Sequence, residues 1–252
     1  TQIFTTLPFG LNAMELNGWL YFGGGMELYR ELYKDFNLRP YPAGNSGCQM
    51  GGWFKKEINS VDDLQGLKMR IPGFGGEVLR RNGGTPVAMP GAEIFTALQT
   101  GTLDAAEWIG PYNDLTFGFH KVAKHYYYPG WHEGGPTLEC IVNKEAYESL
   151  PKDLQTIVDI AASATNDSML AEFMARNAFA LEQIEQMDDI KISPFPKDVM
   201  DAFKESAEEI IAEIIDKDPK FAKIYKSFSD YKKTVEKWTK ISEYALLQNR
   251  YE

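Results

Sequence analysis

The chain has 252 residues, enough for one large or two modest domains with a proper core. Its apolar content of 44%, with 13% aromatic residues, argues against disorder, and no stretch is long and apolar enough to span a membrane. The formal net charge of −10 and the lack of a Lys/Arg-rich run argue against a nucleic-acid surface, although an anionic ligand would need only a local basic group.

The first part of the chain alternates between predicted helices and predicted strands. It opens TQIFTTLPFG, without an initiator Met or a signal peptide, so we expect that processing or truncation has removed something. Residues 14–34 form a predicted helical region, and shorter helices are expected at residues 61–64, 76–82 and 92–99. The predicted strands are residues 39–42, 53–56, 67–71, 86–89, 103–108, 126–128 and 138–142. This alternation predicts an α/β fold with a largely parallel sheet.

The character of the sequence changes after Asn143. A short helix at residues 144–149 precedes a long predicted helix over residues 151–187, which starts at a proline and carries an apolar stripe. A strand at residues 190–192 interrupts before two more helices, residues 199–215 and 220–248. The second of these is highly charged, which is typical of a solvated cover and less often of a dimerisation element.

The two cysteines, Cys48 and Cys140, are too few for a disulfide framework and lack metal-binding spacing. Both stand in apolar sequence, so we expect small buried residues rather than a bridge.

Several catalytic motifs are absent or broken. The stretch GFGGEV at residues 73–78 departs from G-x-G-x-x-G at its last position, and no phosphate-binding loop is present. His132-Glu133 is not followed by the second histidine of H-E-x-x-H, and Ser46 lies in GNSG rather than G-x-S-x-G. A nucleophile with an activating base is therefore unsupported.

What remains is a set of polar residues on loops that follow strands. Glu107 ends an apolar stretch beside Trp108, and Glu133 follows an aromatic run and opens a Gly-Gly-Pro loop. Asn45 and Gln49 lie in the loop AGNSGCQMGG. Acids at the ends of buried strands, among aromatic residues, tend to bind something.

Arg70 is the most informative cation. It ends the predicted strand LKMRI and precedes Pro72, so it lies at the carboxyl end of a strand, where open α/β sheets bind ligands. Its guanidinium can hold a carboxylate by two parallel hydrogen bonds. An ion pair fits the residue types equally well, with Glu107 as a buried acid on the same arginine, and Glu133 could be a surface acid.

Three stretches together resemble a known family. They are PAGNSGCQMGGWFKKEI, LKMRIPGFGGEVLRRNGGTPVAMPGAEIFTALQTGTLDAAEWIGPYND and YYYPGWHEGG. They are similar to the extracytoplasmic substrate-binding proteins of TRAP transporters, in the branch that binds 2-oxo acids, lactate and related small carboxylates with a metal ion. The resemblance extends from about Phe9 to near Met187. The strand–helix portion that usually begins the first lobe has no counterpart here, so the chain resembles an N-terminally truncated member.

The resemblance implies a two-lobed periplasmic-binding-protein-like fold of type II, with a hinge-spanning long helix and a helical C-terminal tail. Residues 1–60 with 125–145 would form the first lobe, lacking its N-terminal portion. Residues 61–124 with 146–216 would form the second lobe with the long connecting helix, and residues 217–252 the tail.

The resemblance also implies the roles of individual residues. Arg70 would pair with the substrate carboxylate, and Gln49 would reach the ligand and the metal. Glu107, the Trp108 carbonyl and Glu133 would complete the metal ligands, which suit a hard cation such as Na⁺ or Ca²⁺. Asn45 and Asn113 would help to line the substrate site.

The implied activity is capture of a small 2-oxo or 2-hydroxy monocarboxylate in the periplasm and its delivery to the membrane permease. A homodimer through the tail is a further expectation, motivated by the apolar residues Phe221, Ile224, Tyr225, Phe228 and Tyr231. The alternative from another class is a metal-dependent enzyme acting on a 2-oxo acid, such as a lyase, with His132 as the one nearby candidate for a general base.

Overall fold

The computed structural model, which describes residues 1–251, contains a six-stranded mixed sheet with strand order β4-β3-β5-β2-β6-β8. Its strands are β2 (Gly52–Phe54), β3 (Lys68–Arg70), β4 (Thr85–Val87), β5 (Ala105–Ala106), β6 (His125–Tyr128) and β8 (Lys191–Pro194). Strand β3 runs parallel to β4 and β5, and β6 runs parallel to β8. Strand β2 is antiparallel to both of its neighbours, β5 and β6. The α/β class is confirmed, with a mixed sheet because β2 enters between two strands in the opposite direction.

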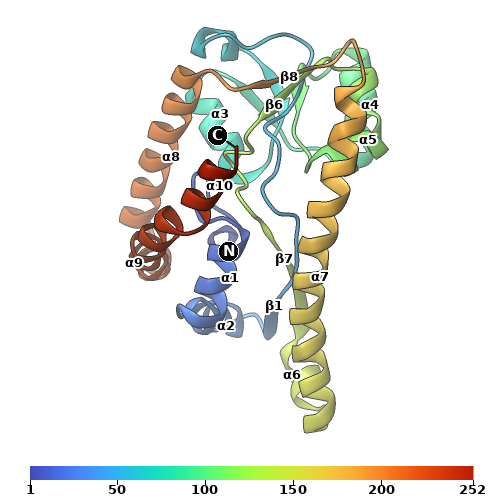
Figure 1. Cartoon of the computed structure of the whole chain (residues 1–252). Coiled ribbons are helices and arrows are strands. Elements are labelled where there is room, and N and C mark those ends of the chain that lie inside the picture. The colour runs from blue at the N-terminus through green and yellow to red at the C-terminus, as the bar shows by residue number, and fades with distance from the viewer. Residues whose placement is uncertain (252) are drawn as a thin grey trace.

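Two long strands form a separate ribbon beside the longest helix. Strands β1 (Leu38–Asn45) and β7 (Thr137–Asn143) pair antiparallel with each other, and the paired strands lie along α7 (Lys152–Glu185). Figure 1 shows α7 running down one side of the molecule, from α4 and α5 at one end to α6 at the other. The ribbon therefore links the large sheet to the helices at the far end, as expected for crossing strands and a long helix.

The remaining helices mostly follow the predicted segments. They are α1 (Ala13–Phe22), α2 (Gly25–Lys34), α3 (Gly73–Arg81), α4 (Gly91–Thr100), α5 (Pro111–Phe117), α6 (Lys144–Glu148), α8 (Lys197–Lys217), α9 (Pro219–Ile241) and α10 (Glu243–Tyr251), with 3-10 helices at Gln2–Phe4, Val61–Leu64 and Phe119–Lys121. The helical region predicted over residues 14–34 is present as two helices, because Gly24 adopts a left-handed conformation (φ +87°) that separates α1 from α2. Helix α5 was not predicted at all.

Three apolar clusters hold these elements together. One lies between the sheet and helices α3 and α8, and another packs the opposite side of the sheet against α4 and the end of α7. The third joins the N-terminal segment, α1 and α2 to α9, with stacked rings of Phe4, Trp19 and Tyr29 at its centre. Strands β2, β3, β5 and β6, whose ends approach the site described below, each contribute residues to one or both of the first two clusters.

The apolar residues that motivated a tail-mediated dimer face inward. Ile224 and Phe228 are buried, and Phe221, Tyr225 and Tyr231 pack against the same N-terminal cluster. The motivation from these residues was wrong, because they cover α1 and α2 of their own chain. The tail exposes other apolar side chains instead, namely Trp238, Ile241, Tyr244, Leu246, Leu247 and Tyr251. Glu252, the last residue of the expected tail, lies outside the described residues.

Both cysteines are exposed, so the expectation of buried residues was wrong. Cys48 follows Gly47 in the loop after β1, and Cys140 lies in the middle of β7. Within residues 1–251, β1 is the one strand that pairs with β7, and Leu138 and Ile141 of β7 are exposed.

The expected division into lobes stays a prediction. Strands β2 and β6, assigned to the first lobe, hydrogen-bond in the same sheet as β3 and β5, assigned to the second. Within residues 1–251, no helix is both long and apolar enough to cross a membrane.

Candidate functional site

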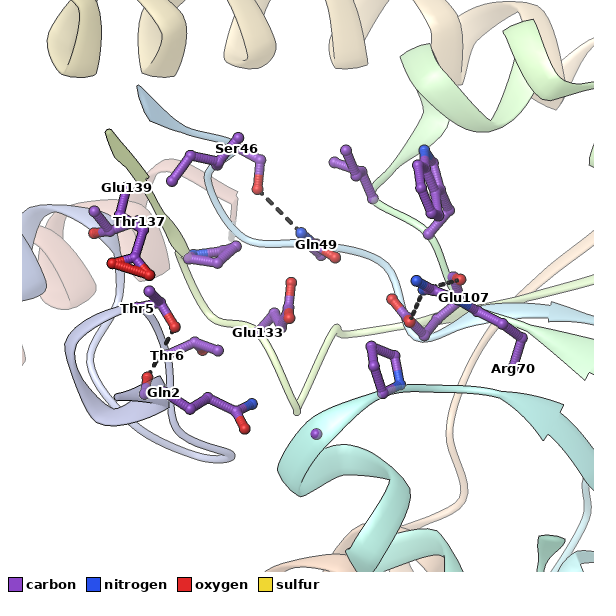
Figure 2. A pocket seen from close by; sticks show the side chains of 16 residues that line it. Gln2, Thr5, Thr6, Ser46, Gln49, Arg70, Glu107, Glu133, Thr137 and Glu139 are labelled. Carbon is purple, nitrogen blue, oxygen red and sulfur yellow. Dashed lines mark hydrogen bonds and ion pairs between the residues drawn. The ribbon is translucent and has the colours of Figure 1, made fainter. Parts of the chain in front are cut away.

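A cavity of about 490 Å³ lies where the large sheet meets the ribbon and the N-terminal segment. The segments that meet there are the end of β3, the loop after β5, the loop between β1 and β2, and the loop between β6 and β7. Figure 2 shows polar side chains from all of them facing the same space. The lining residues are Gln2, Thr5, Thr6, Ser46, Gln49, Arg70, Pro72, Gly73, Glu107, Trp108, Ile109, Glu133, Pro136, Thr137, Leu138 and Glu139.

Arg70 lies at the carboxyl end of β3, as predicted, and its guanidinium is held on several sides. Nη1 donates to the Glu107 carbonyl (3.1 Å) and also to the Glu107 carboxylate, and Nε donates to the Met89 carbonyl (3.4 Å). The carbon of the guanidinium lies 4.9 Å from the centre of the Trp108 ring, a cation–π contact. The side chain is only 13% exposed, so this cation is fixed at the cavity wall rather than free in solvent.

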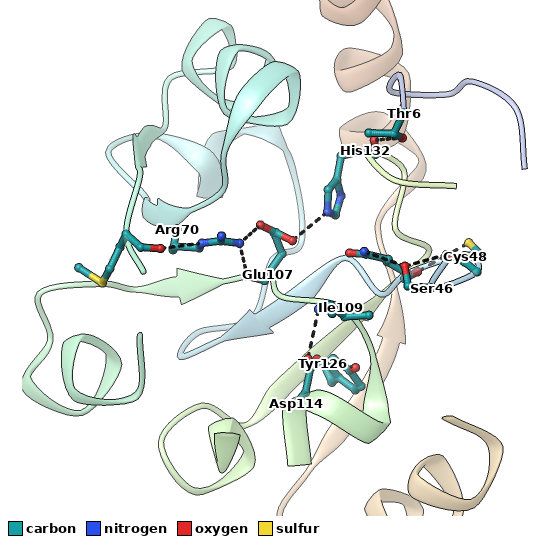
Figure 3. A network of polar contacts seen from close by, with 12 residues as sticks. Thr6, Ser46, Cys48, Arg70, Glu107, Ile109, Asp114, Tyr126 and His132 are labelled. Atoms are coloured by element: carbon teal, nitrogen blue, oxygen red, sulfur yellow. Dashed lines mark hydrogen bonds and ion pairs between the residues drawn. The ribbon is translucent and has the colours of Figure 1, made fainter. Parts of the chain in front are cut away.

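Glu107 is almost completely buried, with a side chain 2% exposed. One carboxylate oxygen pairs with Arg70, and the other lies 3.3 Å from Nε2 of His132 (Figure 3). Burial lowers the pKa of His132, but the hydrogen bond and charge of Glu107 and the charge of Glu133 together raise that pKa above its ordinary value. The structure therefore contains the ion pair between Arg70 and a buried Glu107 that the sequence left open as an alternative. Both residues of this pair line the cavity.

Glu133 and Gln49 contrast with Glu107, because their oxygens lack partners. Within residues 1–251, no group forms an ion pair or hydrogen bond with the Glu133 carboxylate. Burial and the nearby charge of Glu107 raise the pKa of Glu133 to about 7, against the charges of His132 and Arg70, which lower it. The amide of Gln49 donates to Ser46 Oγ (3.1 Å), while its buried Oε1 accepts no hydrogen bond. A bound cation would stabilise both the unpaired acceptor of Gln49 and the ionised form of Glu133, which burial disfavours.

Backbone hydrogen bonds lock the three loops of the site together. The Met50 N–H donates to the Ile109 carbonyl (3.0 Å), and the Gln49 N–H donates to the Glu133 carbonyl (3.1 Å). The Gly130 N–H donates to the Gln49 carbonyl (2.8 Å). The positions of Gln49, Glu133 and the residues around Trp108 are therefore set by the main chain, and only their side chains can adjust.

Asp114 on α5 joins one of these loops to the sheet. Its buried carboxylate accepts hydrogen bonds from the Ile109 N–H (3.3 Å), Trp53 Nε1 (3.0 Å) and the Tyr126 hydroxyl (2.8 Å). Burial raises the pKa of Asp114 to about 7, against the hydrogen bonds, which lower it. The loop that carries Glu107 and Trp108 is thus fastened to β2 and β6.

Five of the predicted site residues come together at the cavity: Gln49, Arg70, Glu107, Trp108 and Glu133. The other two do not line it. Asn45 is fully buried, and its amide bridges two loops, donating to the Gly135 carbonyl (3.0 Å) and accepting from the Gly47 N–H (2.8 Å). Asn113 lies on α5, where its buried Oδ1 has no partner. The geometry therefore does not support a ligand-binding role for Asn45 or Asn113.

Several lining residues were not predicted. The uncharged group comprises Gln2, Thr5, Thr6, Ser46 and Thr137, which come from segments without a recognisable motif. Glu139 on β7 also lines the cavity, and its carboxylate accepts hydrogen bonds from the hydroxyls of Tyr29 and Tyr33. No sequence signal marks these residues, because they reach the cavity through long-range contacts: the pairing of β1 with β7, and the hydrogen bond from the Thr137 N–H to the Thr5 carbonyl (3.0 Å).

The oxygens at the cavity fit a hard cation. Within residues 1–251 there is no group of three or more His, Cys, Asp or Glu side chains placed to hold a metal. The available donors are the carboxylates of Glu107 and Glu133, the orphaned Gln49 Oε1 and the Trp108 carbonyl. Oxygen donors of this kind suit Ca²⁺ or Na⁺ rather than a transition metal.

Residues 1–218 match the family model for bacterial extracellular solute-binding protein, family 7. A monocarboxylate 2-oxoacid-binding periplasmic protein of Nostoc sp. (strain PCC 7120) is 44% identical over 239 residues, which are 95% of this chain and 65% of that protein.

Two solved structures are similar over nearly the whole chain. A TRAP periplasmic solute-binding protein from Colwellia psychrerythraea, with bound calcium and pyruvate, is 48% identical, with a TM-score of 0.96 over 98% of this chain and 76% of that one. A TRAP transporter solute-binding protein from Bordetella bronchiseptica, a mixed-occupancy dimer with calcium and picolinate, is 43% identical, with a TM-score of 0.95 over 98% of this chain and 73% of that one.

Proposed function

This chain belongs to family 7 of the bacterial extracellular solute-binding proteins, and from that membership we propose that it captures a small 2-oxo or 2-hydroxy monocarboxylate together with a cation. The observation that carries the proposal is one cavity lined by the Arg70 guanidinium, the buried and unpaired Oε1 of Gln49 and the carboxylate of Glu133. The relatives named above bind 2-oxoacids or crystallised with pyruvate or picolinate beside calcium. The cation would be Ca²⁺ or Na⁺.

Each residue has a role that follows from its position. Arg70 binds the ligand carboxylate, and the Trp108 ring keeps the guanidinium facing the cavity. Glu133, Gln49 Oε1, the Trp108 carbonyl and Glu107 hold the cation, which when bound supplies positive charge for the carboxylate and the 2-oxo or 2-hydroxy oxygen. Closure of the two lobes would exclude water and strengthen both electrostatic contacts.

Binding takes place outside the cytoplasm, since the family and its curated relatives are extracellular or periplasmic. The natural partner would be the membrane permease of a TRAP transporter, which receives the closed, loaded form. The family consists of solute-binding proteins, so the metal-dependent enzyme is not favoured. His132, its candidate base, is buried and already bonded to Glu107.

A homodimer through the C-terminal helices is also proposed, with a second copy of the chain as the occupant. It rests on the exposed apolar side chains of α9 and α10, among them Trp238 and Ile241, and on the dimer of the Bordetella bronchiseptica protein. Light scattering should report half the molar mass when Trp238 and Ile241 are both changed to serine. An unchanged mass, or a monomeric parent protein, would contradict the dimer.

Calorimetry with pyruvate tests the site. Arg70→Lys keeps the charge but loses the two parallel hydrogen bonds, so pyruvate affinity should fall by about 2–4 kcal/mol, as for truncated charge pairs. Calcium affinity without pyruvate should barely change. Glu133→Gln should weaken calcium and pyruvate together, and more calcium should partly restore pyruvate binding. Pyruvate affinity indifferent to a chelator, or unaltered in Arg70→Lys, would contradict this function.

A further inference from the structure

We propose that Glu107 is an exchange group: without a cation it occupies Arg70, and cation binding transfers it away from Arg70 and so frees the guanidinium for the ligand carboxylate. The inference rests on the proposed function and adds to it a mechanism by which the cation controls the anion subsite. It predicts coupling between cation and carboxylate even when the ligand cannot chelate the cation.

The first observation is how the nitrogens of Arg70 are used. Nη1 donates to both the carbonyl and the carboxylate of Glu107, and Nε donates to the Met89 carbonyl. Within residues 1–251, Nη2 alone has no partner. A carboxylate held by two parallel hydrogen bonds needs two neighbouring nitrogens of the guanidinium. A ligand can therefore gain the Nη1–Nη2 edge only when the Glu107 carboxylate releases Nη1.

The second observation is the charge around the cavity. Among the described lining residues, Arg70 contributes one positive charge, and the carboxylates of Glu107, Glu133 and Glu139 contribute up to three negative ones. With His132 neutral, the cavity wall is net negative, and the one cation in it is already neutralised by an ion pair. An anionic ligand entering this cavity would be repelled, and its principal binding group would be occupied.

The third observation is that Glu107 can change partners without moving its backbone. Its N–H donates to the Arg70 carbonyl (3.1 Å), and the next residues are fixed through Ile109 to Met50 and Asp114. The exchange then needs rotation of the Glu107 side chain, which also alters its contact with Nε2 of His132 (3.3 Å). Glu133 and Gln49, whose oxygens are unpaired, face the same cavity, so a cation held there would offer the Glu107 carboxylate a stronger partner than Arg70.

The experiment compares a ligand that can chelate with one that cannot. Propionate resembles pyruvate in size but lacks the 2-oxo oxygen, so it cannot chelate calcium through a carboxylate oxygen and a 2-oxo oxygen together. Its Kd for the protein is measured at pH 8 by NMR titration, with calcium and with a chelator. The same measurements are made on Glu107→Gln and on the matched control Glu133→Gln, which removes a negative charge from the same cavity but is not paired with Arg70.

We expect calcium to tighten propionate binding to the parent protein by roughly fivefold to a hundredfold, the usual range for coupled sites. In chelator, Glu107→Gln should bind propionate tighter than the parent by a similar factor, because Nη1 is no longer held by a charged partner. Glu133→Gln should also bind propionate tighter than the parent protein in chelator, but by less than about half as much when the change is expressed as the logarithm of Kd. The reason is that this substitution removes only charge repulsion.

Equal gains in the two variants, or no gain in Glu107→Gln, would overturn the exchange and leave pyruvate capture intact. Pyruvate that fails to bind the parent protein in calcium would overturn the proposed function itself. A measurement on the parent protein does not depend on the folding of the glutamate variants: the Arg70 Nε–Hε NMR signal, assigned by its loss in Arg70→Lys, should shift when calcium is added without ligand. A signal that stays in place would also overturn the exchange.

Discussion

The six-stranded sheet and the helix α7 differ in how completely their apolar side chains are covered. In the sheet, Trp53, Phe54, Tyr126 and Tyr127 are all at most 2% exposed. Helix α7 has 34 residues, yet five of its large apolar side chains lie in solvent: Leu154, Ile157, Ile160, Met174 and Phe179. Element length is thus a poor guide to how completely an element buries its apolar side chains. The short strands bury the residues that hold the site in place. Much of the apolar surface of the longest helix, by contrast, is not covered by any part of residues 1–251.

The largest expected effect is in the sheet. Trp53 stacks on Tyr126, with ring centres 4.0 Å apart, and donates to Asp114. Trp53→Ala should lower the free energy of unfolding by about 3–5 kcal/mol, since it leaves a cavity and removes one of the hydrogen bonds to the buried Asp114 carboxylate. The matched control is Phe179→Ala on α7, where the ring is 67% exposed. Urea denaturation measures the free energy of unfolding of both variants. Similar losses in the two variants would contradict the difference between the sheet and α7.

A smaller effect, dependent on pH, is expected at Asp114. Its pKa in the folded protein, about 7, lies above the ordinary value of 3.8, so the protonated carboxyl favours folding at low pH and that contribution is lost as pH rises through 7. Asp114→Asn cannot ionise. Its stability relative to the parent protein should therefore improve between pH 5 and pH 8, by roughly 1–3 kcal/mol. Urea denaturation curves at several pH values test this, and a constant difference between the two proteins would contradict it.

The smallest effect is expected on α7. Ile157 and Ile160 are 59% and 63% exposed, so changing either to serine should alter the free energy of unfolding by less than about 0.5 kcal/mol. A loss of more than about 1 kcal/mol in thermal or urea unfolding would mean that this side of α7 is covered in solution, and the contrast between the two regions would then fail.

The sequence identified those parts of the fold that depend on local pattern. Arg70 at a strand end, Glu107 among buried alanines and Glu133 after an aromatic run were all recognisable, and the structure brings them to one cavity. The orientation of β2 was not recognisable, because three residues carry no sign of the direction in which they pair. The ion pair between Arg70 and Glu107 was not recognisable either, since the residue types allow both an ion pair and a free guanidinium.

The errors have a common physical origin in long-range packing. Periodicity showed that α9 has an apolar face, but not that α1 and α2 of the same chain cover it. Likewise, an amide such as that of Asn45 is equally suited to a ligand and to the Gly135 carbonyl, and the fold decided between them. Cys140 was expected to be buried because its neighbours in sequence are apolar, whereas β7 has a single strand partner.

The contact between Trp108 and Arg70 has an optical consequence. Indole emission responds to nearby charge, and this ring lies 4.9 Å from the guanidinium that we expect to change partners during binding. The protein would therefore carry an intrinsic fluorescent reporter at its site. Four other tryptophans, at positions 19, 53, 131 and 238, supply background emission, and the difference between parent and Trp108→Phe spectra would isolate the reporter. Titrating calcium and carboxylate separately in such difference spectra would follow each binding step without any attached dye.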